Sequence, residues 1–201
     1  MKNRHLVLLI IFIILLNSPI EGFSQKHFLP GYIVTNYGDT IFGKVKDRKS
    51  GTFVKLYDKV RFKPNKGFRK RLSPNNILAY QIGDIKFITM DVRDEIIFFK
   101  RIVEEIPNSN NKQFIKIVSE GYLSWYEKEY IDDSGLSSTF YFKRADEFEM
   151  VFVRTGLFGL NKKRLAEYFN DCPELTEKIL NKNIKKPEKV FWFYNDWCGR
   201  Q

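Results

Sequence analysis

Histidine and cysteine are scarce in this 201-residue chain, which has two of each. His5 lies beside the first apolar run, so His27 is the one histidine in the remainder of the chain. A serine or cysteine nucleophile needs a histidine base held in place, and a zinc site needs three or four ligands. The chain also contains no Gly-x-Ser-x-Gly elbow, no His-Glu-x-x-His motif and no glycine-rich phosphate loop. We therefore expect no catalytic residue of these classes, no metal site and no cofactor.

Long apolar runs are also missing beyond the first 24 residues. Met1–Ser24 has the order of a signal peptide: basic residues, the apolar run Leu6–Leu16, and a polar end with small residues at Gly22 and Ser24. We predict cleavage before Gln25. The alternative is an uncleaved membrane anchor, but this run covers about half of the roughly 20 residues that span a bilayer as a helix. A lipoprotein is not expected because no cysteine lies near the cleavage position, and no transmembrane segment is expected after cleavage.

Acidic residues are outnumbered, with 24 Asp and Glu against 34 Lys and Arg. Cleavage before Gln25 would leave a net charge of +9. An exported protein does not meet chromosomal DNA or RNA, so we expect no nucleic-acid partner. The charge favours anionic lipid head groups, acidic polysaccharide or an envelope protein as partners, or it serves solubility alone. We expect the protein in the periplasm or at the outer-membrane or extracellular surface.

Helical periodicity is missing from residues 25–155, where short β-branched and aromatic segments alternate with turn residues. Gly31–Tyr37 and Thr40–Lys46, separated by a Gly-Asp turn, predict a β-hairpin. Further strands are predicted at 52–63, 68–72, 77–82, 85–91, 96–103, 114–119, 122–130, 138–143 and 148–153. Strands that follow one another without helices between them imply antiparallel pairing. The sequence predicts a mainly β fold, an antiparallel sandwich, roll or barrel-like sheet with a helical C-terminal segment, α+β overall.

Residues 156–201 change to helical periodicity and are predicted to pack on the β domain. Asn161 and Asp171 are predicted N-caps of two helices, and Pro187 begins a third. Cys172 and Cys198 are the two cysteines of the chain, and both lie in this segment. In an oxidising compartment the simplest interpretation is a disulfide, which would contribute about 3–4 kcal/mol. Two unpaired buried thiols are the alternative.

Positive charge is densest between residues 59 and 71, and this stretch is the candidate anion-binding site. Its basic residues are Lys59, Arg61, Lys63, Lys66, Arg69, Lys70 and Arg71. Because side chains alternate across a strand, those at 59, 61 and 63 would share one face while Val60 and Phe62 enter the core. A hairpin through Pro64–Gly67 would bring the second basic group beside the first. The alternative is a solvated outer face that discourages edge-to-edge aggregation.

Acidic residues form clusters, and a glycosidase needs only two carboxylates that face each other. The clusters are Asp91, Asp94 and Glu95; Glu104 and Glu105; Glu127 and Glu129 with Asp132 and Asp133; and Asp146, Glu147 and Glu149. Each cluster lies where a turn or a strand edge is expected, which favours solvated carboxylates. The spacing of a calcium-binding loop is not matched. An envelope carbohydrate hydrolase that uses two of these carboxylates is the alternative function.

Three stretches of the chain resemble a known family: GYIVTNYGDTIFGKV at residues 31–45, LAEYFNDCPEL at 165–175 and YNDWC at 194–198. The family consists of uncharacterised exported envelope proteins of Gram-negative bacteria. The resemblance implies an envelope location and a β module with a helical tail, and it implies no activity and no catalytic residue. We therefore predict a non-enzymatic binding or assembly module of the cell envelope, with a basic face for anionic envelope components.

Overall fold

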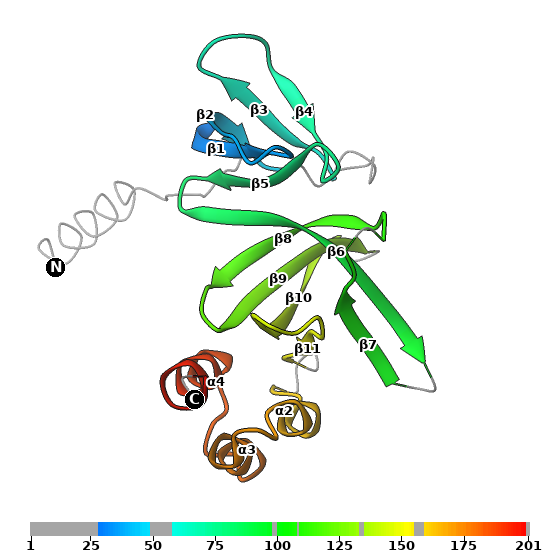
Figure 1. Cartoon of the computed structure of the whole chain (residues 1–201), viewed down its shortest axis with the longest axis vertical. Coiled ribbons are helices and arrows are strands. Elements are labelled where there is room, and N and C mark those ends of the chain that lie inside the picture. The colour runs from blue at the N-terminus through cyan, green and yellow to red at the C-terminus, as the bar shows by residue number, and fades with distance from the viewer. Residues whose placement is uncertain are drawn as a thin grey trace, which may run out of the picture.

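Figure 1 shows the computed structural model of the chain, which describes residues 28–48, 58–97, 100–107, 109–132, 135–154 and 159–199. Within them the chain forms an antiparallel sheet followed by three short helices. The predicted signal peptide and its cleavage position lie outside the described residues. So do His27, residues 52–57 of a predicted strand, and Asp133.

Eleven strands belong to one sheet, which is not closed. The strands are β1 (Leu29–Thr35), β2 (Thr40–Lys46), β3 (Val60–Pro64), β4 (Lys70–Leu72), β5 (Ile77–Ile82), β6 (Ile85–Ile97), β7 (Lys100–Glu105), β8 (Lys112–Ser119), β9 (Leu123–Asp132), β10 (Gly135–Arg144) and β11 (Val151–Phe152). Their order is β11-β10-β9-β8-β6-β5-β1-β2-β3-β4, and β7 pairs with β6. The paired strands are antiparallel, so the predicted mainly β, antiparallel fold class is confirmed.

The predicted hairpin at the start of the sheet is confirmed as β1 and β2. Its turn depends on Gly38, whose φ of +90° lies in the left-handed region that residues with a side chain disfavour. Thr35 Oγ1 accepts hydrogen bonds from two backbone N–H groups of the turn. These contacts stabilise the turn that fixes the register of the two strands, in which Tyr32 lies opposite Phe42.

Strand β6 is longer than the sequence predicts. The patterns at 85–91 and 96–103 predict two strands, whereas β6 runs unbroken from Ile85 to Ile97 and pairs with β7. The two strands project from the sheet as a hairpin (Figure 1), in which Arg93 donates a hydrogen bond of 2.6 Å to Glu104. The sequence analysis expected a turn or a strand edge at the acidic residues of this hairpin. The pairing of Arg93 with Glu104 instead supports two paired strands there.

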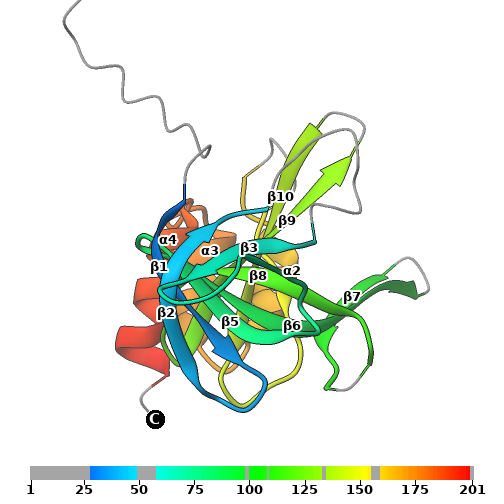
Figure 2. The same cartoon turned by 90° about the horizontal axis from the view of Figure 1, so that it is seen from above.

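Side-chain alternation divides the core between the two faces of the sheet. On the inner face, Tyr80, Phe87 and Phe114 belong to a cluster formed by strands β1 to β6 and β8. The rings of Tyr80 and Phe87 stack with their centres 4.5 Å apart. The inner face continues to Trp125 and Phe142, on which the helices pack. Figure 2 shows this curled sheet from above, with the hairpins β6–β7 and β9–β10 extending away from it.

A buried ion pair joins two strands that lie far apart in the order of the sheet. Arg48 follows β2, and its guanidinium lies 2.5 Å from Glu129 on β9, although four strands separate β2 from β9. The Arg48 side chain is only 4% exposed, and its guanidinium lies 4.8 Å from the centre of the Phe87 ring. The sheet is therefore rolled so that the end of β2 approaches β9, and the ion pair connects them through the interior of the roll.

The three helices follow the sheet as α2 (Lys162–Tyr168), α3 (Pro173–Leu180) and α4 (Pro187–Phe193), and α4 continues into the π-helical turn η3 (Tyr194–Cys198). They cover β9, β10 and β11 at one end of the molecule (Figure 1). Their buried side chains share one apolar cluster with the strands beneath them. The helical C-terminal segment is thus held to the sheet mainly by burial of apolar surface.

The prediction that Asp171 caps α3 is wrong. The helix begins at Pro173 with Cys172 as its N-cap residue, and no side chain forms a capping hydrogen bond. The Asp171 carboxylate instead accepts hydrogen bonds from the Tyr194 hydroxyl (2.6 Å) and from the Arg144 guanidinium (2.5 Å). A charged donor and a phenol on two other elements therefore compete successfully with the backbone N–H groups of the helix.

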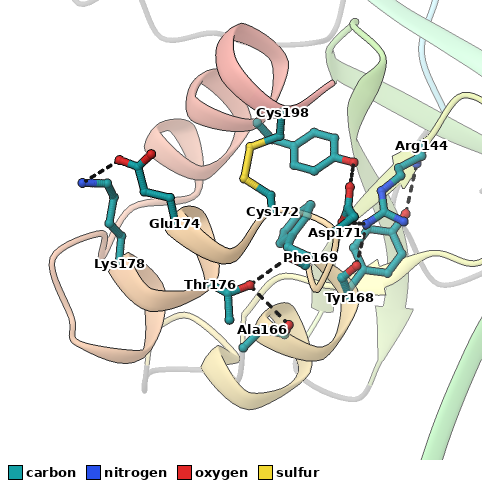
Figure 3. The surroundings of a disulfide bond; sticks show 11 residues. Arg144, Ala166, Tyr168, Phe169, Asp171, Cys172, Glu174, Thr176, Lys178 and Cys198 are labelled. Carbon is teal, nitrogen blue, oxygen red and sulfur yellow. Dashed lines mark hydrogen bonds and ion pairs between the residues drawn. A yellow bond between two sulfur atoms is a disulfide. The ribbon is translucent and has the colours of Figure 1, made fainter. Parts of the chain in front are cut away.

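Two contacts fix the end of the chain, and the predicted disulfide is one of them. Cys172 and Cys198 are bonded, which joins the start of α3 to the end of η3 (Figure 3). The second contact is made by Asn195, whose amide accepts a hydrogen bond from the Leu123 N–H (2.9 Å) and donates one to the Leu123 carbonyl (3.0 Å). The Asn195 side chain thus pairs with the first residue of β9 as a neighbouring strand would.

Glu129→Gln should lower the free energy of unfolding by about 3 kcal/mol, because it leaves the buried Arg48 charge without its partner across the roll. The measurement is urea unfolding followed by intrinsic fluorescence. Glu120→Gln is the matched control, since it breaks an exposed ion pair with Lys86 and should change stability by less than about 1 kcal/mol. Equal effects of the two substitutions would contradict a closing role for Arg48 and Glu129.

Replacing both cysteines, Cys172→Ser with Cys198→Ser, should lower the free energy of unfolding by about 3 kcal/mol, because the unfolded chain is no longer constrained by the cross-link. Thermal unfolding with and without a thiol reductant measures the effect. The reductant should destabilise the wild-type protein and leave the double variant unchanged. A wild-type melting temperature that does not respond to the reductant would contradict the prediction.

Candidate anion-binding face

The predicted basic hairpin is formed by β3 and β4. In its ladder Arg61 lies opposite Arg71, and Val60 lies opposite Leu72. Val60 is buried in the inner cluster, so alternation places Arg61 and Arg71 on the outer face of the sheet. The predicted hairpin therefore does bring Arg61 beside Arg71. The prediction that Lys63 shares the strand face of Arg61 is also confirmed, because Val60 and Phe62, which alternate with them along the strand, are buried.

Strand β2 adds two further lysines to the outer face. Lys46 lies opposite Arg61, and Lys44 lies opposite Lys63. Lys46, Arg61 and Arg71 thus form one row across three strands, and Lys44 and Lys63 form a second row beside it. We call these five residues the basic face. Like charges directly opposite each other destabilise a sheet because their Cβ atoms are about 4.5–5.5 Å apart.

No carboxylate among the described residues forms an ion pair with Lys44, Arg61, Lys63 or Arg71. The undescribed stretch 49–57 contains no Asp or Glu. Elsewhere on the sheet the opposite pattern holds, and Lys116 is 2.7 Å from Glu127 on the neighbouring strand. These four cations of the basic face are therefore without an ion pair among the described residues, on a protein that pairs many of its other charges.

The other four predicted residues do not extend the basic face. Lys70 shares its side of β4 with the buried residues of the neighbouring strand. Lys66 lies in the turn between β3 and β4, and Lys59 precedes β3 with its side chain exposed. The guanidinium of Arg69 lies 5.1 Å from the centre of the Phe28 ring, which is a cation–π contact. These residues add positive charge around the rows without belonging to them.

Sequence reasoning did not identify Lys44 and Lys46 as part of the site. Their spacing of two residues in a predicted strand is the signal that places them on one face. Their alignment with Arg61 and Lys63 depends on the pairing of β2 with β3, which the undescribed stretch 49–57 separates in sequence. The alternation of residues within a strand thus predicts which side chains share a face. Only the register between β2 and β3 shows that the lysines of β2 lie beside the basic residues of β3.

The acidic clusters contribute to ion pairs and hydrogen bonds in the described part of the chain. Asp91 accepts a hydrogen bond from the Ser109 hydroxyl, 3.2 Å away, and the Asp146 carboxylate accepts one from Tyr122. Most of the other carboxylates face cations, in the pairs Asp94–Lys128, Glu104–Arg93, Glu105–Lys143, Glu127–Lys116, Glu129–Arg48, Glu147–Arg144 and Glu149–Arg164. These contacts hold the carboxylates in structural roles on several different strands.

A second polar group lies inside the roll, around Arg48. The Tyr80 hydroxyl donates a hydrogen bond of 2.8 Å to Asp47, whose carboxylate also contacts Arg48. Burial raises the pKa of Tyr80 well above its ordinary value; the Arg48 charge opposes this rise, and the Asp47 charge adds to it. A cavity of about 350 Å³ lies beside Arg48 and Glu129. We assign this group to closing the roll, because its charges are satisfied by one another.

No protein-family model, curated protein or solved structure matches the chain. Within the described ranges, no helix is both long enough and apolar enough to cross a membrane. In the same ranges, no group of three or more histidine, cysteine or acidic residues is arranged to hold a metal ion. The assignment of function therefore rests on the geometry and the charge of the chain itself.

Tyr80→Phe should reduce the loss of stability at alkaline pH. Above about pH 10 a tyrosine of the unfolded chain loses its proton, whereas folded Tyr80 keeps it, so stability falls with pH by about 1.4 kcal/mol per unit. The substitution removes this contribution, although it costs about 1 kcal/mol at neutral pH through the lost hydrogen bond to Asp47. Urea unfolding between about pH 9 and about pH 11 measures both slopes. Identical slopes would contradict the prediction.

Proposed function

We propose that this protein is a non-enzymatic binding or assembly module of the cell envelope, and that the basic face binds an anionic envelope component. Phosphate groups of lipid head groups and carboxylate or phosphate groups of polysaccharides have the required charge. The proposal includes export to the periplasm or the outer surface, which the signal-peptide pattern of the sequence supports. Arg61 and Arg71, which lie directly opposite each other and form no ion pair with a described residue, carry the proposal.

The row of like charges lowers the stability of the sheet, and the fold does not require like charges at these positions. Arg61 and Arg71 are directly opposite each other, and a pair of opposite charges at the same positions would stabilise the ladder. Proteins tolerate such local costs where a surface must bind a ligand. An anion placed over Arg61 and Arg71 would offset the repulsion between them.

Protection of the sheet edge explains only part of this charge. Strand β4 is the last strand of the sheet, and charged side chains on an edge strand discourage pairing with another molecule. Lys44 and Lys46 are on β2, however, which is paired on both sides and presents no free edge. Their position opposite further cations therefore supports binding rather than edge protection.

No contact among the described residues favours the alternative of a carbohydrate hydrolase. Such an enzyme needs two carboxylates on either side of a cleft that admits the substrate. The acidic side chains Glu127 and Glu129 share one strand face, but each is held by a cation, Lys116 and Arg48 respectively. The alternative stays a prediction, and the binding module is the function that the geometry supports better.

Arg71→Glu should raise stability and weaken binding in the same variant. The substitution replaces a like-charged pair with an opposite-charged pair, which should increase the free energy of unfolding by about 0.5–1 kcal/mol. Binding should become about tenfold weaker, measured with vesicles of phosphatidylglycerol and phosphatidylcholine and with alginate at two salt concentrations.

Lys185→Glu is the matched control, because it makes the same change of charge on an exposed loop between α3 and α4. This control should leave the binding of both probes unchanged. Equal binding by Arg71→Glu and the wild-type protein would assign the basic face to solubility alone. A wild-type protein that binds neither probe would overturn the proposed function.

A further inference from the structure

A shallow groove lies beside the basic face on the outer side of the sheet. It has a volume of about 560 Å³ and is lined by Tyr32, Phe42, Asn65, Gln81 and Asp84, among others. Phe42 is two residues from Lys44 on the same face of β2, which is about 7 Å along the strand. The groove and the basic face are therefore parts of one continuous surface.

The groove combines an exposed aromatic surface with amide and carboxylate groups. Phe42 is 64% exposed, and its ring packs edge to face on Tyr32 with the ring centres 5.9 Å apart. This contact orients the Phe42 ring while leaving much of it open to a ligand. The negative face of an aromatic ring attracts the C–H bonds that a pyranose ring presents on its flat side.

The polar groups of the groove match hydroxyl groups better than anions. The Gln81 amide nitrogen donates a hydrogen bond of 2.7 Å to the Gly83 carbonyl, which orients the side-chain oxygen as an acceptor. The Asp84 carboxylate forms no ion pair or hydrogen bond with any described residue, so it is available to accept hydrogen bonds from hydroxyl groups. A carboxylate in the groove repels a phosphate or a second carboxylate, so an uncharged, polyhydroxylated group fits it best.

We infer that the ligand of this surface is an acidic polysaccharide, with one uncharged sugar ring in the groove and the acidic group of a neighbouring sugar on Lys44 and Lys63. This inference rests on the proposed function, because it uses the basic face as the anion site. An aromatic platform followed by two cations along the strands suits a chain in which sugar rings and charges alternate. A lipid surface would contact the cations, but its anionic phosphate groups would be repelled by the Asp84 carboxylate of the groove.

Phe42→Ala tests the groove without changing the charge of the basic face. The variant should bind hyaluronan, in which uncharged and acidic sugars alternate, about tenfold more weakly than the wild-type protein, measured by isothermal titration calorimetry. Its binding to alginate and polygalacturonate should be unchanged, because every sugar of these polymers is acidic and binds through the cations alone. Its binding to vesicles of phosphatidylglycerol and phosphatidylcholine should be unchanged. Neutral dextran should not bind to either protein, because it cannot use the cations.

Phe148→Ala is the matched control, since Phe148 is 62% exposed and lies away from the groove, between β10 and β11. It should bind every polysaccharide as the wild-type protein does. Thermal unfolding of both variants shows whether they remain folded at the temperature of the titration. Phe42→Ala and Phe148→Ala with the same affinity for hyaluronan would overturn the inference about the groove.

The probes separate failure of this inference from failure of the proposed function. If the wild-type protein binds vesicles but none of the three polysaccharides, the ligand is a lipid head group; the polysaccharide inference is then wrong and the proposed function stands. If it binds neither vesicles nor polysaccharides, the proposed function is wrong as well. Binding of hyaluronan that is lost in Phe42→Ala and retained in Phe148→Ala supports both.

Discussion

The buried contact between Arg48 and Glu129 is the interaction on which the arrangement of the sheet depends. Backbone hydrogen bonds connect each strand only to its neighbours, and they leave the curvature of an open sheet free to vary. The guanidinium of Arg48 links β2 to β9 across four intervening strands and lies against the Phe87 ring. Removing these charges from water is costly, and the costs are offset only in the rolled sheet, where Asp47, Glu129 and the aromatic ring all contact the same cation. The roll then encloses the aromatic core of the first half of the chain.

A second set of polar contacts holds the C-terminal segment against the sheet. Asp171 connects Tyr194 to Arg144, Asn195 pairs with the backbone of β9, and the disulfide joins Cys172 to the end of η3. These residues come from short stretches at 171–172 and 194–198 of the chain. Short helices have little stability of their own, and these contacts add to the apolar packing that fixes them.

The basic face differs from the rest of the surface because its charges are opposed by like charges. Arg48 and Lys116 on the inner side of the sheet contact carboxylates, whereas Arg61 lies between Lys46 and Arg71. The two groups therefore have different effects on stability. The Arg48–Glu129 pair closes the roll and the Lys116–Glu127 pair supports the ladder of β8 and β9, whereas the outer row weakens the ladder in which it lies. Under the proposed function, the ligand would offset this cost because it would bind the folded state alone.

The sequence by itself determined the fold class, the hairpin of β1 and β2, the helical C-terminal segment and the disulfide, because these features depend on local periodicity, turn residues and the count of cysteines. It also determined that Arg61 and Lys63 share a strand face, since side chains alternate along any strand. Only the tertiary structure decided that Lys44 and Lys46 join them, that Asp171 binds Arg144 instead of capping α3, and that Arg48 meets Glu129. These contacts depend on the register between strands and on the rolling of the sheet, and both arise from packing between residues that are distant in sequence.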